Sequence, residues 1–180
     1  YEKGWIYRDN RIINWCPFHE TSLSDLELED LELDDTLSTI RYPLADGSGS
    51  IAIATVRPAT ILGDVAVAVH PDDERYKQLV GKKAIVPFVE RRVPIIADER
   101  VEREFGTGAL KVTPGHDPMD FAIGRDHGLP EPSVIGPDGR MNAHAGELDG
   151  LTQDEAAKRI LDWIKERDQL VSREHYRHSV

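Results

Sequence analysis

The chain has one cysteine, fewer basic than acidic residues, and no long apolar run. Because Cys16 has no second cysteine to pair with, internal disulfides are excluded and we expect a reducing, cytoplasmic setting. No apolar stretch approaches the roughly 20 residues that a membrane helix needs, so we expect no membrane association. Lys and Arg total 22 against 33 Asp and Glu, a formal net charge of -11. Since phosphate backbones attract clustered cations, any contact with RNA must be local.

The rest of the composition fits one folded domain, with 39% hydrophobic residues in a chain of 180. Short β-rich runs are separated by turn signals and brief helical stretches. They occupy residues 49–57, 65–70, 84–89, 93–97, 109–113 and 133–135. This pattern predicts a mainly β fold, a closed barrel with helices outside it.

Three further segments carry local signals. Residues 72–79 have a helical pattern that stops at a glycine, and Thr152 with Glu155 forms a capping box before a second, longer helix. The acidic residues of 25–35 alternate with leucines. This alternation predicts solvated edge strands with an interruption near Asp30.

The most informative segment is the strand-to-helix turn of residues 106–120. Alternation along the strand places Lys111 and Thr113 on one face. Asp117 is suited to cap the following helix, and Asp120 lies in its first turn. Many helices begin with such a pair of aspartates, so capping alone is one interpretation. A polar-substrate site is the other.

A second polar cluster lies in residues 54–60. Thr55 and Arg57 share one strand face, and Thr60 follows a proline turn. Taken alone, the cluster is also typical of an ordinary strand end with solvated hydroxyls. The presence of both clusters favours a functional site.

Six segments carry a family resemblance that spans nearly the whole chain: residues 14–17, 24–27, 55–60, 64–75, 94–98 and 105–120. In them the chain resembles the editing (CP1) domain inserted in the class I aminoacyl-tRNA synthetases for valine, isoleucine and leucine. The run of residues 111–118 is most similar to the valyl branch. Val56 and Ala59 depart from the family pattern, and Ala59 removes a carboxylate suited to orient Arg57.

The resemblance implies a closed β-barrel core of the valyl, isoleucyl and leucyl editing-domain type, and a division of the chain. Residues 1–35 would connect to the parent synthetase, 36–171 would form the editing domain, and 172–180 would return to the parent. Because the chain begins with Tyr1 rather than Met, we expect it to be a piece of a longer polypeptide.

The implied reaction is post-transfer editing, the hydrolysis of the ester bond of mischarged threonyl-tRNA(Val). Its partners would be the 3′ end of that tRNA carrying threonine and the rest of the parent synthetase in cis, with no cofactor, no metal and a monomeric state. One alternative is an isoleucyl-type domain that clears valyl-tRNA(Ile). The other is a non-catalytic insert that docks the tRNA acceptor end.

The resemblance also implies residue roles on the helix side of the site. Asp120 would hold the substrate's α-ammonium, and Lys111 would supply positive charge toward the ribose-phosphate or the oxyanion. Thr113 and Asp117 would contact the threonine hydroxyl and order the water. His116 would act either as a base or only as a hydrogen-bonded brace for its neighbour Asp117.

The opposite wall of the same site would be formed by Thr55, Arg57 and Thr60. Phe105 would stack on the terminal adenine, a contact worth about 1–3 kcal/mol per base in single-strand binding proteins.

Two metal-based interpretations compete. His116 and Asp117 form an H-D doublet which, with His70, Asp120 and His127, would suit a metal-dependent phosphohydrolase, although the usual scaffold of that class is helical.

Separately, Cys16 and His19 have the C-x-x-H spacing of half a zinc site. In the resembled family the other half of this site follows the editing insert, and here it would lie beyond Val180.

Overall fold

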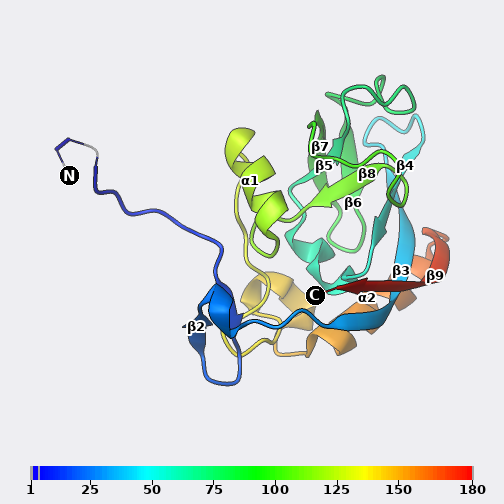
Figure 1. The fold of residues 1–180 in the computed structure, drawn as a ribbon. Coiled ribbons are helices and arrows are strands. Elements are labelled where there is room, and N and C mark those ends of the chain that lie inside the picture. The colour runs from blue at the N-terminus through cyan, green and yellow to red at the C-terminus, as the bar shows by residue number, and fades with distance from the viewer. Residues whose placement is uncertain (1, 4, 180) are drawn as a thin grey trace.

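The computed structural model describes residues 2, 3 and 5–179, and leaves Tyr1, Gly4 and Val180 outside the description (Figure 1). Within these residues, β-strands form three separate sheets, and two α-helices and three short 3-10 helices lie around them. The fold is therefore mainly β with peripheral helices, as the sequence predicts.

The first main sheet has the strand order β4-β3-β9 and is antiparallel. Its strands are β3 (Glu32–Pro43), β4 (Ser50–Thr55) and β9 (Leu170–Ser179). Alternate residues such as Ile40, Ile51 and Ile53 are buried, which is the period expected of a sheet with one face on the core. The chain enters this sheet on β3 and leaves it on β9.

The second main sheet has the order β6-β7-β5-β8, with β5 and β7 parallel and the other pairs antiparallel. Its strands are β5 (Ala66–Val69), β6 (Lys83–Val86), β7 (Arg91–Ala97) and β8 (Ala109–Val112). Every residue of β5 is buried because both faces are covered. Val67 and Val69 face the main core, while Ala66 and Ala68 pack in a smaller cluster with Ile123 of the first α-helix.

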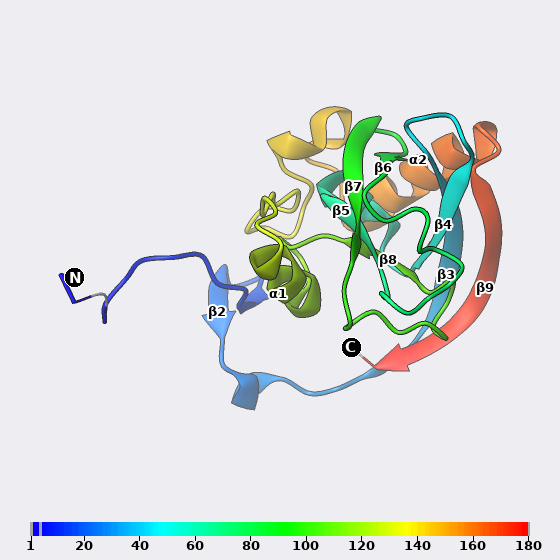
Figure 2. The ribbon, with the colours of Figure 1, turned by 90° about the horizontal axis from the view of Figure 1, so that it is seen from above.

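The prediction of a closed barrel is wrong. The two sheets curve around a shared core (Figure 2), and an isolated bridge between Leu44 and Ala84 joins them on one side. On the other side, β4 and β8 are neighbours but no ladder connects them within the described residues. The physical reason is that polar side chains from both strands occupy the space between them, where Thr55 and Lys111 line the same cavity.

Two α-helices begin where the capping signals predict. Asp117 accepts hydrogen bonds from the first free N–H groups of α1 (Pro118–Asp126), and Gly128 follows that helix with a positive φ. Thr152 and Glu155 complete the capping box of α2 (Gln153–Glu166), whose Ile160 enters the main core. In the part of the chain that the structure describes, no helix has the length and apolarity to span a membrane.

Three short 3-10 helices accompany them: η1 (Asp25–Glu27), η2 (Pro58–Gly63) and η3 (Ala143–Leu148). The acidic segment therefore becomes a strand only from Glu32, where β3 begins, because residues 25–27 form η1 instead. η2 is entirely buried, and it carries the chain from the end of β4 under the site and into β5.

Two predicted elements are absent from the described residues. Residues 72–79 form turns instead of a helix: the Leu79 N–H donates to the Tyr76 carbonyl three residues back, and side-chain bonds from Arg75 to the Arg103 carbonyl and from Tyr76 to the Thr107 carbonyl hold the segment against the loop before β8. Residues 133–135 contribute only an isolated bridge between Ile135 and Met141. The N–H of Val134 is used instead by a side chain of the site, as described below.

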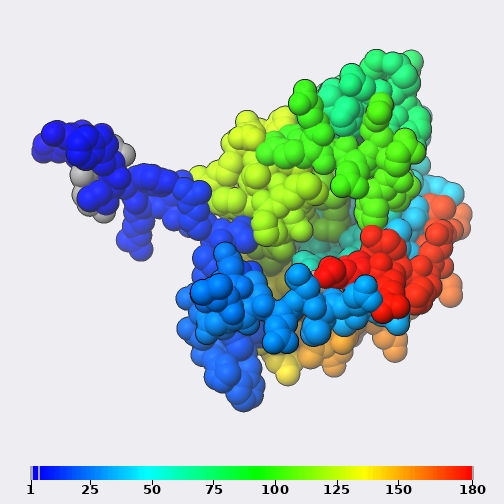
Figure 3. Space-filling model, viewed as in Figure 1, coloured from blue at the N-terminus to red at the C-terminus, as the bar shows by residue number. Residues whose placement is uncertain are grey.

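The N-terminal segment lies apart from the two main sheets (Figures 1 and 3). It carries a small hairpin of β1 (Asn14–Cys16) and β2 (Thr21–Leu23). Asp9 pairs with Arg125 of α1 at 2.7 Å, which ties the segment to the helix that opens the site. Trp5, at 82% exposure, contributes nothing to the core.

Replacing Ile160 by Ala is expected to lower the free energy of unfolding by about 2–5 kcal/mol, because it leaves a cavity in a closely packed core. Its neighbour Arg159 is exposed, and Arg159→Ala is expected to change that energy by less than about 0.5 kcal/mol. Urea unfolding curves of both variants measure the difference. Equal losses in the two variants would contradict the packing of α2 described here.

Candidate active site

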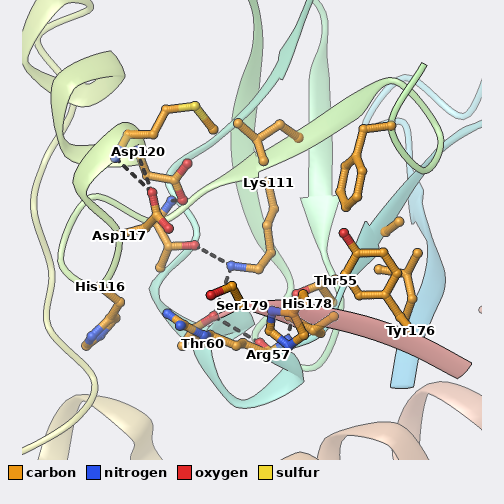
Figure 4. A pocket seen from close by; sticks show the side chains of 17 residues that line it. Thr55, Arg57, Thr60, Lys111, His116, Asp117, Asp120, Tyr176, His178 and Ser179 are labelled. Atoms are coloured by element: carbon orange, nitrogen blue, oxygen red, sulfur yellow. Dashed lines mark hydrogen bonds between the residues drawn. The ribbon is translucent and has the colours of Figure 1, made fainter. Parts of the chain in front are cut away.

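A cavity of about 340 Å³ lies where β4 and β8 face each other without a ladder (Figure 4). Its walls come from β4, η2, β8, the start of α1 and the end of β9. All nine side chains that the sequence predicts for the site line it: Thr55, Arg57, Thr60, Phe105, Lys111, Thr113, His116, Asp117 and Asp120. The volume is in the range of small-molecule sites.

Lys111 lies at the centre of this cavity and is only 8% exposed. Its Nζ donates to the Thr60 hydroxyl at 2.9 Å and to the Thr113 hydroxyl at 2.7 Å. The predicted alternation is confirmed, because the side chain of Lys111 in β8 and that of Thr113, the residue directly after β8, meet on the same face. A buried ammonium also needs a counter-charge, which the sequence analysis did not identify.

Asp64 supplies that counter-charge, with Oδ1 at 3.6 Å from the Lys111 Nζ. The Asp64 side chain is fully buried, and it accepts hydrogen bonds from the Thr113 hydroxyl at 2.7 Å and the Tyr42 hydroxyl at 2.6 Å. Burial raises the pKa of Asp64 above its ordinary value, while Lys111 and the two hydroxyl donors oppose that rise. Next to this carboxylate, the buried Tyr42 phenol has its pKa raised well above the usual range, first by burial.

Asp120 lies beside this cluster, in the first turn of α1. Its Oδ2 accepts the Thr113 backbone N–H at 2.8 Å, and its Oδ1 is buried without a hydrogen-bond partner among the described residues. Burial raises the pKa of Asp120 to about 7, against the opposing effects of Lys111 and the Thr113 N–H. An unpaired buried oxygen in a cavity suits a cationic ligand group.

Asp117 acts as the N-cap of α1. Its Oδ1 accepts from the N–H groups of Met119 at 2.8 Å and Asp120 at 3.0 Å. The cap therefore sets the start of the helix and with it the position of Asp120. Asp117 also lines the cavity, so the capping interpretation and the site interpretation hold together.

His116 is held by a hydrogen bond to the backbone. Its Nε2 accepts the backbone N–H of Val134 at 2.9 Å. Burial, reinforced by the positive charges of Lys111 and Arg57, lowers the pKa of His116 to about 4. The ring is therefore neutral near pH 7, and its accepting nitrogen is engaged by Val134, a partner that the sequence did not predict.

The opposite wall is organised by hydroxyl bonds to the backbone. Thr55 accepts the Arg57 N–H at 3.1 Å, and the Thr60 hydroxyl donates to the Arg57 carbonyl at 2.9 Å. The Arg57 side chain is exposed and has no ion pair within the described residues, as expected with Ala59 in place of a carboxylate. Ala59 itself is buried in the core.

An aromatic group forms the rim. Phe105, 43% exposed, meets the Tyr176 ring edge-on at 5.7 Å between centroids, and Tyr176 stacks on His178 at 5.5 Å. Tyr176 and His178 come from β9, and sequence reasoning missed them because they alternate like any exposed strand. Asp64 was missed too, although a lone carboxylate between two apolar runs was an available signal.

The phosphohydrolase ligand set is not assembled. His127 pairs with Asp98 at 3.0 Å, and the Nδ1 of His70 accepts the Asp72 N–H. Within the part of the chain that the structure describes, no three His, Cys, Asp or Glu side chains gather as metal ligands.

Cys16 and His19 do lie together, with Sγ and Nδ1 3.4 Å apart. No third ligand of this kind joins them among the described residues. Cys16 and His19 as half of a zinc site therefore stay a prediction.

Comparison with known proteins identifies the class. The family model described as "Leucyl-tRNA synthetase, editing domain" matches residues 71–165. The chain therefore belongs to the aminoacyl-tRNA synthetase editing-domain family. Its full length is 54% identical to part of the valine--tRNA ligase of Carboxydothermus hydrogenoformans and 53% identical to that of Geobacillus stearothermophilus. Within the family it is an editing domain of the valyl-tRNA synthetase type. The chain spans about a fifth (20%) of the length of these relatives.

Solved structures show the same fold. The LeuRS of Agrobacterium radiobacter, in a ternary complex with tRNA and LeuAMS, has a TM-score of 0.64 at 20% identity over 80% of this chain and 20% of its own. GlLeuRS-CP1 has a TM-score of 0.59 at 11% identity, over 77% of this chain and 97% of its own. At such identities the likeness concerns the fold alone.

The raised pKa of Asp120 predicts a pH-dependent stability difference from the Asp120→Asn variant, which cannot titrate there. The folded chain holds this proton up to about pH 7, whereas the unfolded chain loses it near 3.8. The stabilising contribution is therefore complete below pH 3.8 and is lost as the pH rises to about 7. Urea unfolding of both proteins at steps across this window is expected to show the wild-type chain losing stability relative to the variant. A difference that is constant with pH would contradict the raised pKa.

Proposed function

We propose that the chain performs post-transfer editing, the hydrolysis of the ester that joins threonine to the 3′ end of tRNA(Val). The observation that carries this proposal is the buried carboxylate of Asp120, which lines a cavity next to the Lys111 cluster and whose Oδ1 has no hydrogen-bond partner among the described residues. The valyl-type family of the chain supports it. An aminoacyl ester presents an α-ammonium, a carbonyl and a ribose, and the cavity has a group suited to each.

Asp120 binds the α-ammonium. With its pKa raised to about 7, the carboxyl is only partly ionised near neutral pH before the substrate arrives. A cation at Oδ1 favours the ionised form, because an opposite charge stabilises the carboxylate. The resulting charge-assisted pair fixes the ester carbonyl relative to β8.

Lys111 stabilises the negative charge that develops on the carbonyl oxygen. Its ammonium is fixed before the reaction by Thr60, Thr113 and Asp64, so little reorganisation is needed when charge develops. The water oxygen bonds to the carbonyl carbon, the bond to the ribose oxygen breaks, and a proton ends on that ribose oxygen. Because the ester is activated, positioning a water suffices and no covalent nucleophile is required.

Threonine is the expected substrate because it is nearly isosteric with valine. An apolar pocket rejects an added hydroxyl by only about 10²-fold, a value known for valyl-tRNA synthetase itself. The Thr113 hydroxyl already donates to Asp64 and accepts from Lys111. We therefore assign the threonine hydroxyl to the second oxygen of Asp117. Valine would leave that oxygen unpaired, at a cost of about 1–3 kcal/mol.

The aromatic rim of the cavity binds the terminal nucleoside of the tRNA. Phe105 stacks on the adenine, and Arg57 with Thr55 and Thr60 forms the opposite wall. Residues 1–35 and 172–180 connect the domain, residues 36–171, to the rest of the synthetase in cis. The net charge of -11 makes capture of free tRNA weak, so the parent supplies most of the tRNA contact.

Asp120→Ala is expected to reduce deacylation of threonyl-tRNA(Val) by about 100-fold or more, because removing one partner of a buried charge pair costs about 2–5 kcal/mol. The rate is measured in single turnover with the chain in excess over the tRNA, so that weak capture does not mask the chemistry.

Asp126→Ala is the matched control, since this exposed aspartate ends the same helix. It is expected to retain the wild-type rate. Equal hydrolysis by Asp120→Ala would overturn the ammonium assignment. A wild-type preference for valyl-tRNA(Ile) would favour the isoleucyl alternative, and no hydrolysis above buffer would favour a docking insert.

A further inference from the structure

Asp64 lies beneath the cavity without lining it, and its backbone is held rigidly. It is the C-cap residue that ends η2, and only Val65 separates it from the buried strand β5. The Asp64 N–H donates to the Ile61 carbonyl at 3.0 Å. The Arg91 guanidinium donates to the Asp64 carbonyl at 2.6 Å and to the Leu62 carbonyl at 2.7 Å. The backbone on either side of the carboxylate therefore has little freedom.

The carboxylate of Asp64 connects two strands from different sheets. Oδ2 accepts from Tyr42 of β3, and Oδ1 accepts from Thr113 at the end of β8. Both oxygens are thus engaged by hydroxyl donors, and Lys111 adds the charge that a fully buried carboxylate needs. No other ion pair to Lys111 is formed within the described part of the chain.

These bonds give the Thr113 hydroxyl a direction. Because its proton points to Asp64, its lone pair faces the Lys111 ammonium. An amide in place of the Asp64 carboxylate offers one accepting oxygen instead of two, so either the Thr113 or the Tyr42 hydroxyl loses its acceptor, and the buried ammonium loses its counter-charge. Lys111 would then sample other rotamers, as a long side chain with three rotatable donors does.

We propose that Asp64 is a positioning residue for ester hydrolysis, which aims the Lys111 ammonium at the reacting carbonyl through the Thr113 hydroxyl and its own charge. It contacts neither the substrate nor the cavity surface. This inference rests on the editing function proposed above, and it adds that the catalytic geometry of β8 is set by a carboxylate on a different segment, with Tyr42 as its second support.

Asp64→Asn tests the proposal, because it keeps the shape and removes the charge. The expected result is a fall in kcat for threonyl-tRNA(Val) of about tenfold or more with KM changed less than about twofold, since chemistry and not binding is affected. A second readout is the Lys111 Nζ proton signal in ¹H–¹⁵N spectra. It is expected to be visible in the wild-type chain, where the ammonium is buried and hydrogen-bonded, and lost in the variant.

Asp98→Asn is the matched control. Asp98 is also a buried carboxylate, bonded to Arg100 and His127, but it lies outside the cavity. Its replacement is expected to leave kcat and the Lys111 signal unchanged. Tyr42→Phe is a milder second variant that removes one donor to Asp64, and it is expected to lower kcat by about twofold to fivefold with KM unchanged.

The outcomes separate this inference from the editing function. If Asp64→Asn keeps the wild-type kcat, the inference is wrong, whether or not the Lys111 signal is lost. If that variant does not fold, an unchanged kcat in Tyr42→Phe overturns the inference. If the wild-type chain hydrolyses no ester, the editing function fails, and the Lys111 signal still decides whether Asp64 holds the ammonium.

Discussion

The burial of one ammonium group governs the rest of this structure. Lys111 lies inside a domain whose neighbouring strands are largely apolar, and a charge in that position is tolerated only when it is paired and hydrogen-bonded. Asp64 provides the charge, and two threonine hydroxyls complete the bonding. Because these groups come from η2, the turn before β5 and the end of β8, the cluster holds the site side of the domain together.

The cluster also explains where the two sheets fail to join. A ladder between β4 and β8 would bring their backbones together and leave no room for the polar side chains that lie between them. The cavity therefore lies at this open seam between β4 and β8. On the opposite side the bridge between Leu44 and Ala84 holds the two sheets together. The loop before β8 does come close to β4, since a Cβ on Gly106 would lie 2.8 Å from that of Ala54. The proposed ester site lies in this cavity, whose walls include Asp120 on one side and the Phe105 rim on the other.

Sequence reasoning succeeded where short-range rules decide the structure. Strand alternation placed Lys111 with Thr113, and capping preferences placed Asp117 at the start of α1. Both rules act within a few residues. It failed where distant segments meet: Asp64 and Thr113 are 49 residues apart, and no local pattern links them. The barrel prediction failed for the same reason, because closure depends on which side chains fill the seam.

The local failures have a similar cause. The helical pattern of residues 72–79 loses to long-range contacts, because the Arg75 and Tyr76 side chains donate to the carbonyls of Arg103 and Thr107. The run of residues 133–135 is apolar enough for a strand, but Val134 gives its N–H to His116. In both places a bond to a distant residue decides the local structure. The spacing of apolar residues along the sequence carries no information about such contacts between distant residues.

The roles proposed for Asp120, Asp117 and Lys111 are tested most directly by a structure of the chain bound to a non-hydrolysable threonyl-adenosine analogue. We expect the α-ammonium within hydrogen-bond distance of Asp120 Oδ1, the threonine hydroxyl at Asp117, and the Lys111 Nζ facing the group that replaces the ester carbonyl. An amino group bound elsewhere in the cavity, with Asp120 Oδ1 still unpaired, would contradict these roles.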